Sequence, residues 1–330
     1  MVVVLIIATF SASALWYQWR AVEIEEADRS RTEAAWVLVG ALDWARLILR
    51  EDARAGGADH LAEPWAVPLG EIKLTSFLMA DRGVARDVAE GLPDAILSGE
   101  ILDAQAKLNV RNLVQNGQPV RTAVAAFQKL FALLGLPETQ VATLVEGMAR
   151  AAPRASAAPD PARPQGTVVS GGLQAASAAA SDGTPLMPHR VDELVWLGLP
   201  AATVEAITPY VTVLPSATTL NINTAPAEAL YAGVPGLDMA GARLLVEARR
   251  SHYFASLIQP AQLVQSLGAS FVAGQHGIAS QYFGVRARLR IDRTTLEQRS
   301  LIMRNGTNVA LVWSERGAVR AERLASASSR

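Results

Sequence analysis

The chain begins with an apolar section, continues with a polar one and then becomes amphipathic. Residues 1–19 carry no charged side chain, and residues 20–36 mix acidic and basic side chains without proline or glycine. Apolar residues then return at helical spacing, at positions 38, 41, 42, 45, 48 and 49. This pattern predicts one continuous helix of about 50 residues, ~75–80 Å long at 1.5 Å per residue.

The first third of this helix is just long enough to cross a bilayer, which needs roughly 20 apolar residues. We expect Trp16 and Trp19 at the membrane interface, and Trp36 and Trp44 packed between the helix and a sheet. A buried helix of a soluble core is the alternative, but it does not explain the polar section between two apolar ones. The predicted membrane segment contains Val2, Leu5, Ile6, Ile7, Phe10, Leu15, Trp16 and Trp19.

The end of the chain has a clear β pattern. Residues 283–291 alternate apolar side chains with Arg286, Arg288 and Arg290, which is typical of a half-buried strand. Asn305-Gly306 between two apolar runs predicts a hairpin. We therefore expect a three-stranded antiparallel meander over about 281–314, with the three arginines on its solvent-facing side.

The middle of the chain is mainly helical. Helical patterns cover 119–150 and resume at "VDELVWLGLP", residues 191–200, and "YVTVLP" at 210–215 reads as an extended segment. Residues 151–188 are rich in Ala, Pro, Gly and Ser, a composition that buries too little apolar surface to offset its ordering entropy. We interpret this stretch as a flexible insertion.

The segment "LNINTAPAEALYAGVPGLDMAGARLLVEARR", residues 220–250, predicts two short helices joined by a tight turn. Its first part resembles "LNVRNL" at 108–113, which suggests two related helical subdomains in tandem. We expect Thr224 and Asp238 to cap the two helices, and Leu230, Leu237, Leu244 and Leu245 to form a core. The residues that we assign to this structural motif are Asn109, Asn221, Asn223, Thr224, Pro235, Gly236 and Asp238.

The hairpin resembles units that grip DNA backbones, yet its chemistry argues against that use. Asp238 stands where DNA-binding hairpins have a second glycine, and its charge would face a phosphate at short range. The arginines of 220–258 are balanced by acidic residues, so little counterion release would drive binding. We predict a packing module that does not bind nucleic acid.

Composition gives little support to catalysis or metal binding. The chain has no cysteine, a net charge of −1 and only four histidines, at 60, 189, 252 and 276. None of these is spaced from another like a metal pair, and no phosphate loop or nucleophile motif occurs. We read Asp103 and the pair Glu25-Glu26 as solvated or capping groups. We therefore predict no catalytic residue, no cofactor site and no metal site.

Several segments together resemble the minor pseudopilin K family of type II secretion systems. They are the pilin-like N-terminal helix, "PWA" at 64–66, "ILDAQAKLNVRNL" at 101–113, "VDELVWLGL" at 191–199, "LNINTAPAEAL" at 220–230 and "SQYFGVRA" at 280–287. The resemblance implies an α+β fold, in which a long pilin-type helix packs on a small antiparallel β-sheet with a large helical domain inserted. It also implies a basic leader ending in glycine before the apolar section. Some family members bind calcium, but no ligand set is matched in this chain.

The domain organisation that follows has five parts. They are a membrane and pilin helix at 1–55; pseudopilin loops and short strands at 56–107; a first SAM-like helical subdomain at 108–214, with the insertion at 151–188; a second SAM-like, helix-hairpin-helix-like subdomain at 215–279; and a pseudopilin β-meander and tail at 280–330.

The function implied by the resemblance is structural. Such a protein is a single-pass inner-membrane protein with its globular part in the periplasm. It assembles with I- and J-type minor pseudopilins at the tip of the pseudopilus, where it initiates or caps the fibre for protein export. The alternative that we keep open is a membrane-tethered DNA-binding protein of the competence type, which rests on the helix-hairpin-helix likeness alone.

Overall fold

The structure is a computed structural model, and it describes residues 2–76, 95–151, 185–265, 268–291 and 294–318. Most of the insertion predicted at 151–188 therefore lies outside the described residues. The chain divides into two compact units. Unit 1 comprises residues 1–54, 64–102 and 284–330, and unit 2 comprises residues 55–63 and 103–283.

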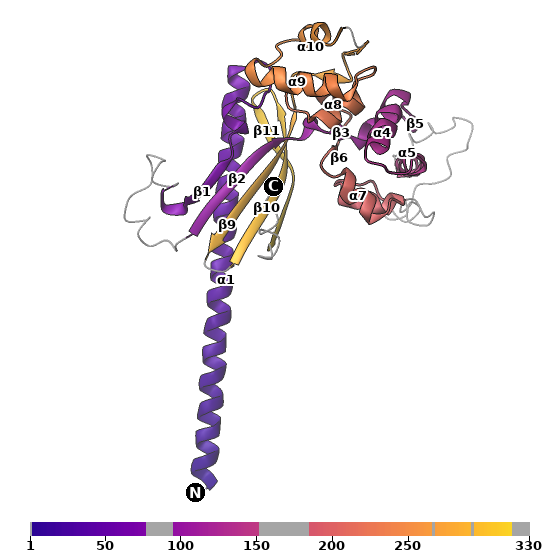
Figure 1. The fold of residues 1–330 in the computed structure, drawn as a ribbon. Coiled ribbons are helices and arrows are strands. Elements are labelled where there is room, and N and C mark those ends of the chain that lie inside the picture. The colour runs from indigo at the N-terminus through magenta and orange to yellow at the C-terminus, as the bar shows by residue number, and fades with distance from the viewer. Residues whose placement is uncertain (1, 77–94, 152–184, 266–267, 292–293, 319–330) are drawn as a thin grey trace, which may run out of the picture. The chain divides into compact units, whose positions relative to one another are not determined.

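Unit 1 consists of one long helix and one sheet (Figure 1). Helix α1, Val2–Ala55, is continuous for 54 residues, as the sequence pattern predicts. Its C-terminal part lies along the sheet, and its N-terminal part extends beyond the sheet as a single helix (Figure 1). The 3-10 helix η1, Pro64–Ala66, contains the buried Trp65.

The sheet has five strands in the order β1-β2-β9-β10-β11. The predicted meander is confirmed, because its last three strands follow each other in the chain and β10 and β11 form an antiparallel hairpin closed at Asn305 and Asn308. The β1–β2 pair is also antiparallel. The strands are β1, Leu69–Lys73; β2, Ala95–Asp103; β9, Tyr282–Ile291; β10, Thr294–Asn305; and β11, Asn308–Ala318.

The core of unit 1 forms where α1 packs on the sheet. Ala34 and Leu38 of the helix meet Leu97 of β2 and Leu289 of β9, all buried. Each fully buried leucine contributes about 1.5–3 kcal/mol relative to exposure. Polar contacts add to this docking: Arg304 of β10 pairs with Asp52 near the end of α1.

The three arginines of β9 face solvent but are paired. Arg286 lies 2.6 Å from Glu100 and Arg290 lies 3.3 Å from Glu71. Arg288 and Arg299 both contact the buried Glu297. Burial raises the pKa of Glu297, but the hydrogen bonds from the two arginines outweigh it and lower that pKa below its usual range.

Unit 2 is helical with short strand pairs. Its helices are α4, Arg121–Leu133; α5, Thr139–Ala151; α7, Ala201–Ile207; α8, Ala227–Gly233; α9, Met239–Ser251; and α10, Ile258–Leu263. Its 3-10 helices are η2, Ala104–Ala106; η3, Val110–Leu113; and η4, Asp192–Leu197, the last within the helical stretch predicted at 191–200. Its short strands are β3, Leu108–Asn109; β4, Val114–Gln115; β5, Gln118–Pro119; β6, Val211–Thr212; β7, Leu220–Asn221; and β8, His276–Gly277.

The unit boundaries differ from the sequence-based division at three places. Residues 56–63, 103–107 and 280–283 belong to unit 2, although the sequence-based division groups them with the pseudopilin strands. The reason is a set of hydrogen bonds: Asp59 bonds to the backbone of Ile278 and Ser280, and Gln105 bonds to Thr219 and Gln281. These partners are far away in the sequence, so local patterns do not reveal them.

Candidate functional site

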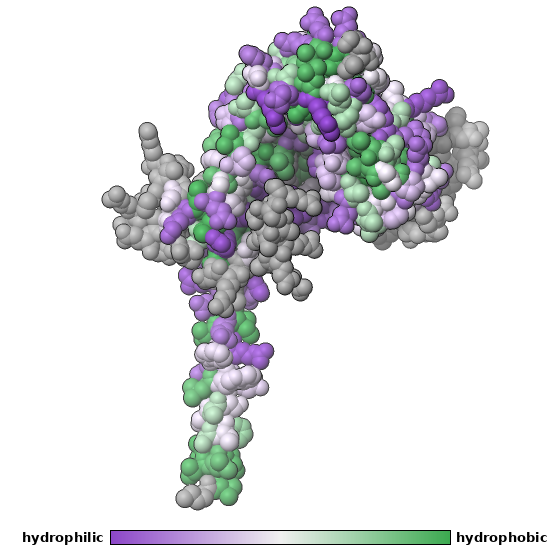
Figure 2. Space-filling model, viewed as in Figure 1, coloured by the Kyte–Doolittle hydropathy of each residue, from purple (hydrophilic) through white to green (hydrophobic). Residues whose placement is uncertain are grey.

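The N-terminal part of α1 fits a single-pass membrane anchor. It contains an 18-residue window with a mean hydropathy of 1.6, none of it buried. All eight residues that we assigned to the membrane segment lie here, and they are between 48% and 73% exposed. Figure 2 shows hydrophobic residues gathered at this end of α1, with hydrophilic ones along the helix above them. A long apolar surface of this kind is stable when lipid covers it.

The middle of α1 carries an outward face that the sequence pattern did not predict. Trp36 is 71% exposed, Leu47 50% and Trp44 42%, so the expectation that both tryptophans pack on the sheet is wrong for Trp36 and only partly right for Trp44. The buried stripe of Ala34, Leu38, Leu42, Ala45 and Leu49 occupies the opposite side of the helix. We call Trp36, Gly40, Asp43, Trp44 and Leu47 the outward face of α1.

The two similar sequence segments have similar local structures. Asn109 and Asn221 each follow a leucine in a two-residue strand, and each strand joins a parallel pair, β3–β6 and β7–β8. Each Oδ1 accepts the backbone N–H two residues later, of Arg111 and of Asn223, at 3.0 Å. Each Nδ2 then donates a hydrogen bond to a segment distant in the sequence. The Nδ2 of Asn109, for example, donates to the carbonyl oxygen of Ser216 at 2.8 Å. Both asparagines therefore fix a strand-to-helix turn to the rest of unit 2.

Asp103 is the centre of a buried polar network that sequence reasoning missed. Its Oδ1 accepts the backbone N–H of Gln105 at 2.7 Å, so it is an N-cap of η2. Its Oδ2 accepts from Asn221 at 2.9 Å, Thr224 at 2.6 Å and Ser280 at 2.7 Å. Burial raises the pKa of Asp103, and the four hydrogen bonds oppose that shift. The network joins three segments of unit 2.

This network overturns one predicted cap. Thr224 does not cap helix α8, whose N-cap is Pro226 with no side-chain hydrogen bond. The Thr224 hydroxyl donates to Asp103 instead. Asn223 is also used elsewhere, because it exchanges hydrogen bonds with the backbone N–H and carbonyl of Phe254 at 2.8 and 2.9 Å.

The second predicted cap is confirmed. Asp238 is the N-cap of α9, and its Oδ1 accepts the backbone N–H of Gly241 at 2.7 Å. Of the four leucines expected in this core, three are buried and Leu244 is exposed. The helical face of α9 that faces the core runs through Ala242 and Leu245, and Leu244 lies beside it.

The tight turn at 235–238 contacts the loop at 268–270, although Pro235, Gly236 and Asp238 themselves are exposed. Gly236 has φ +76°, and a Cβ there would lie 2.3 Å from the carbonyl oxygen of Gly268. The carbonyl oxygen of Pro235 accepts the N–H of Ser270 at 3.0 Å. Lys129 adds a second contact, because its Nζ donates to the carbonyl oxygens of Tyr231 and Leu237 at 2.6 and 2.7 Å. These contacts fix the turn to the rest of unit 2.

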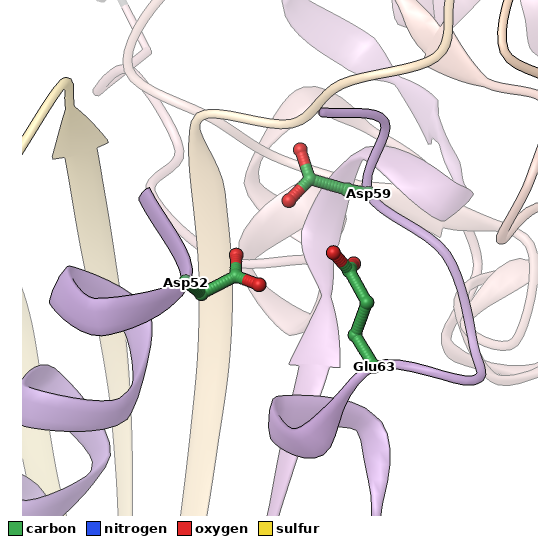
Figure 3. Close-up of side chains that lie close together, drawn as sticks. All are labelled: Asp52, Asp59 and Glu63. Carbon is green, nitrogen blue, oxygen red and sulfur yellow. The ribbon is translucent and has the colours of Figure 1, made fainter. Parts of the chain in front are cut away.

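Two acidic side chains of unit 2 lie near one another. The carboxylate oxygens of Asp59 and Glu63 come within 4.8 Å of each other. Figure 3 shows how the two side chains lie. Asp59 already accepts the N–H of Ser280 at 2.6 Å, and Glu63 that of His60 at 2.8 Å. Two carboxylates are fewer ligands than the six to eight oxygens that calcium takes. Asp52, also labelled in Figure 3, belongs to unit 1, where it pairs with Arg304.

A hollow of unit 2 offers no acid–base chemistry in the part of the chain that the structure describes. It has a volume of about 300 Å³ and is lined by Lys107, Arg111 and uncharged residues, with no aspartate, glutamate or histidine among its described lining residues. His276 is buried elsewhere: its Nδ1 accepts the N–H of Val272 and its Nε2 bonds to the carbonyl oxygen of Gly233. Burial lowers the pKa of His276, so the ring is neutral and holds two loops together.

Comparisons with known proteins agree on one family. Two family models for type II secretion system protein K match residues 106–216 and 220–279. A type II secretion system protein K from Pseudomonas aeruginosa is 28% identical over 266 residues, which cover 78% of this chain and 73% of that protein.

A solved structure shares the fold. One chain in the crystal structure of the GspK-GspI-GspJ complex of the type 2 secretion system from enterotoxigenic Escherichia coli matches with a TM-score of 0.57 and 18% identity. The match covers 88% of this chain and 98% of that chain. It therefore includes parts of both units.

Proposed function

Because the chain belongs to the type II secretion system protein K family, we propose that this minor pseudopilin lies at the tip of the pseudopilus, where it initiates or caps the fibre. Its long helix and antiparallel sheet are the pilin-like part of the molecule, and unit 2 is the part that sets it apart from a simple pilin fold.

The observation that carries this proposal is the point of insertion of unit 2. Strands β2 and β9 are neighbours in the sheet, yet residues 103–283 lie between them in sequence. A repeating fibre subunit needs only the helix and the sheet. A large helical unit placed between two neighbouring strands adds volume that the next subunit would have to avoid, and this favours a terminal position in the fibre.

We propose I- and J-type minor pseudopilins as partners. A protein with this fold was solved in a complex named GspK-GspI-GspJ. The open N-terminal part of α1 supports assembly within a bilayer, since none of the residues that the structure describes covers it.

We further propose that α1 anchors the protein in the inner membrane with everything after Arg20 in the periplasm. Alkaline phosphatase fused after Arg330 should then be active, because this enzyme matures only outside the cytoplasm. Activity of a cytoplasmic reporter fused at the same point would contradict the orientation.

We propose no catalytic, cofactor-binding or nucleic-acid-binding role. The capping role of Asp238 and the balanced charges of residues 220–258 support the last point, so the competence-type alternative is not favoured. Whether calcium binds stays open to experiment, for example by calorimetry with the purified protein.

Immunogold electron microscopy tests the tip position. In cells that display pseudopili, gold against an epitope on this chain should mark one end of each fibre. Label along the fibre length would contradict the proposal. Loss of secretion on deletion of the gene, restored by the intact gene, should accompany the tip label.

A further inference from the structure

The hollow of unit 2 combines positive charge with an apolar floor. Its volume of about 300 Å³ is at the lower end of the range for small-molecule sites. Lys107 and Arg111 are the charged residues of its described lining, and both are positive. The apolar part of the lining includes Leu108, Val114, Val120, Ala126, Phe127 and Leu220. The hollow therefore favours a ligand that carries a negative group on a small apolar body.

Arg111 has hydrogen-bonding capacity that the fold does not use. Its Nη1 lies 2.9 Å from the sulfur of Met187, a weak acceptor, and no aspartate or glutamate of the described ranges pairs with its guanidinium. A guanidinium holds five N–H donors in a fixed fork, which fits the two oxygens of a carboxylate. The backbone N–H of Arg111 donates to Oδ1 of Asn109 at 3.0 Å, so the side chain starts from a fixed turn.

The polar part of the lining suits a peptide group. Oγ1 of Thr218 accepts from Nδ2 of Asn109 at 3.0 Å, which leaves the hydroxyl proton of Thr218 to donate. Gln275 donates through Nε2 to the hydroxyl of Thr122 at 3.3 Å, and its Oε1 accepts from no residue that the structure describes. The lining thus offers one donor and one acceptor beside its apolar surface.

The wall that carries Thr218 is fixed before any ligand binds. Nδ2 of Asn112 donates to the carbonyl oxygen of Thr218 at 2.7 Å, and Oδ1 of Asn112 accepts the N–H of Thr218 at 3.0 Å. A wall held in this way loses little conformational freedom on binding, which favours affinity.

We propose that this hollow binds the C-terminal end of a peptide chain, with the terminal carboxylate on Arg111 and a small apolar terminal side chain on the floor. The carboxylate and the side chain of a terminal residue lie on the same carbon, so one residue can reach both surfaces. The donor of Thr218 and the acceptor of Gln275 then serve the preceding peptide group. This inference goes beyond the proposed function, and it does not depend on the position of the protein in the fibre.

Calorimetry with the full-length chain in detergent tests the proposal, with the dipeptide acetyl-Ala-Val as the probe. We expect a dissociation constant of roughly 0.1–1 mM, as for a ligand of this size. Acetyl-Ala-Val amide, which lacks the charge, should bind at least about tenfold more weakly. Absence of binding by acetyl-Ala-Val at concentrations up to about 10 mM would overturn the proposal.

Arg111→Gln should weaken the binding of acetyl-Ala-Val at least roughly tenfold, and Arg111→Lys should weaken it less, since lysine keeps the charge without the fork. Arg243→Gln is the matched control, because Arg243 is exposed on α9 and lies outside the lining. The control should bind like the wild type. Unchanged affinity in Arg111→Gln, or an equal loss in the control, would show that this guanidinium does not hold the carboxylate.

Filling the hollow gives an independent test. Ala123 of α4 lines the hollow, so Ala123→Leu should take up part of its volume and weaken binding at least about tenfold. Ala125→Leu on the same helix is the control, because Ala125 is exposed and lies outside the lining. Thermal unfolding shows whether each variant is folded, and if Ala123→Leu is not, the Arg111 variants decide.

Two further probes distinguish the sources of a carboxylate. Acetyl-Glu-Ala amide carries its carboxylate on a side chain, and pentanoate is an aliphatic acid without a peptide group. Both should bind more weakly than acetyl-Ala-Val. Equal or tighter binding of either one would show that the hollow does not select the end of a peptide chain, and the inference would be wrong.

Discussion

Replacing Asp103 tests whether the buried network holds unit 2 together. In Asp103→Ala, the N–H of Gln105 loses its acceptor. Asn221 keeps other acceptors, among them the hydroxyl of Ser280 at 3.0 Å, and Thr224 keeps a weak contact at 3.5 Å. The alanine variant thus leaves one donor without an acceptor and two hydroxyls poorly paired.

The expected cost follows from these losses. A buried donor without a partner costs about 1–3 kcal/mol, and each hydrogen bond to a charged group contributes about 1.5–3 kcal/mol. Removing the buried charge offsets part of this loss of stability, because desolvation of the charge costs several kcal/mol. We expect Asp103→Ala to lower the free energy of unfolding by about 2–4 kcal/mol, and Asp103→Asn by less, since the amide keeps one acceptor oxygen.

Urea unfolding of the detergent-solubilised chain, followed by near-UV circular dichroism, measures the effect. With a slope of about 2 kcal/mol per molar urea, the midpoint should fall by roughly 1–2 M for Asp103→Ala. Asp192→Ala is the control, because the Asp192 side chain is 73% exposed, and it should change the midpoint little. Equal midpoints for the two alanine variants would refute the role of the network.

The pH dependence gives a second check on Asp103. Because burial raises its pKa in the folded protein, its contribution to stability is fully present below the pKa of the unfolded chain and is lost as pH rises through the folded pKa. The wild type should therefore gain stability relative to Asp103→Asn as the pH is lowered from neutral. A relative loss on acidification would show that the four hydrogen bonds outweigh desolvation and lower the pKa instead.

Other consequences can be tested on the same chain. Gly236→Ala should lower the unfolding free energy by about 1–3 kcal/mol, measured in urea, because the new Cβ meets the carbonyl oxygen of Gly268 and the left-handed backbone is strained. Asp238→Ala should cost about 1 kcal/mol in the same assay by removing the cap of α9; no change would contradict the capping role. Lys129→Met should cost about 1.5–3 kcal/mol, since two carbonyl oxygens lose a charged donor. In a fluorescence anisotropy titration, the protein should bind duplex DNA no more tightly than ~10 µM near physiological salt, and tighter, salt-dependent binding would contradict the packing role of the hairpin.

The parts of the fold that local patterns determine were predictable. Alternation at 283–291 and the turn at Asn305-Gly306 predict the last three strands, because each signal lies within a few residues of the element that it specifies. The unbroken helix α1 follows equally from the absence of proline and the spacing of its apolar residues.

Contacts across long sequence distances were not predictable. Thr224 stands where a threonine often caps a helix, but its hydroxyl meets a carboxylate 121 residues away. The outward direction of Trp36 was within reach, however. The predicted stripe through Leu38 and Leu42 already defined the buried side, and Trp36 lies opposite it; the general tendency of tryptophan to be buried misled the interpretation.

The continuity of α1 links the height of unit 1 above the membrane to its orientation about the helix axis. Each residue removed from the exposed polar section would lower the sheet by about 1.5 Å and turn it by roughly 100° relative to the anchor. Loss of a single residue would thus swing Trp36 away from any neighbour fixed in the bilayer. Loss of seven residues would shorten the helix by about 10 Å yet leave the direction within roughly 20° of the original. The length of this helix and the direction in which its faces point can therefore be changed separately. Insertions or deletions in steps of seven residues change the length and keep the direction.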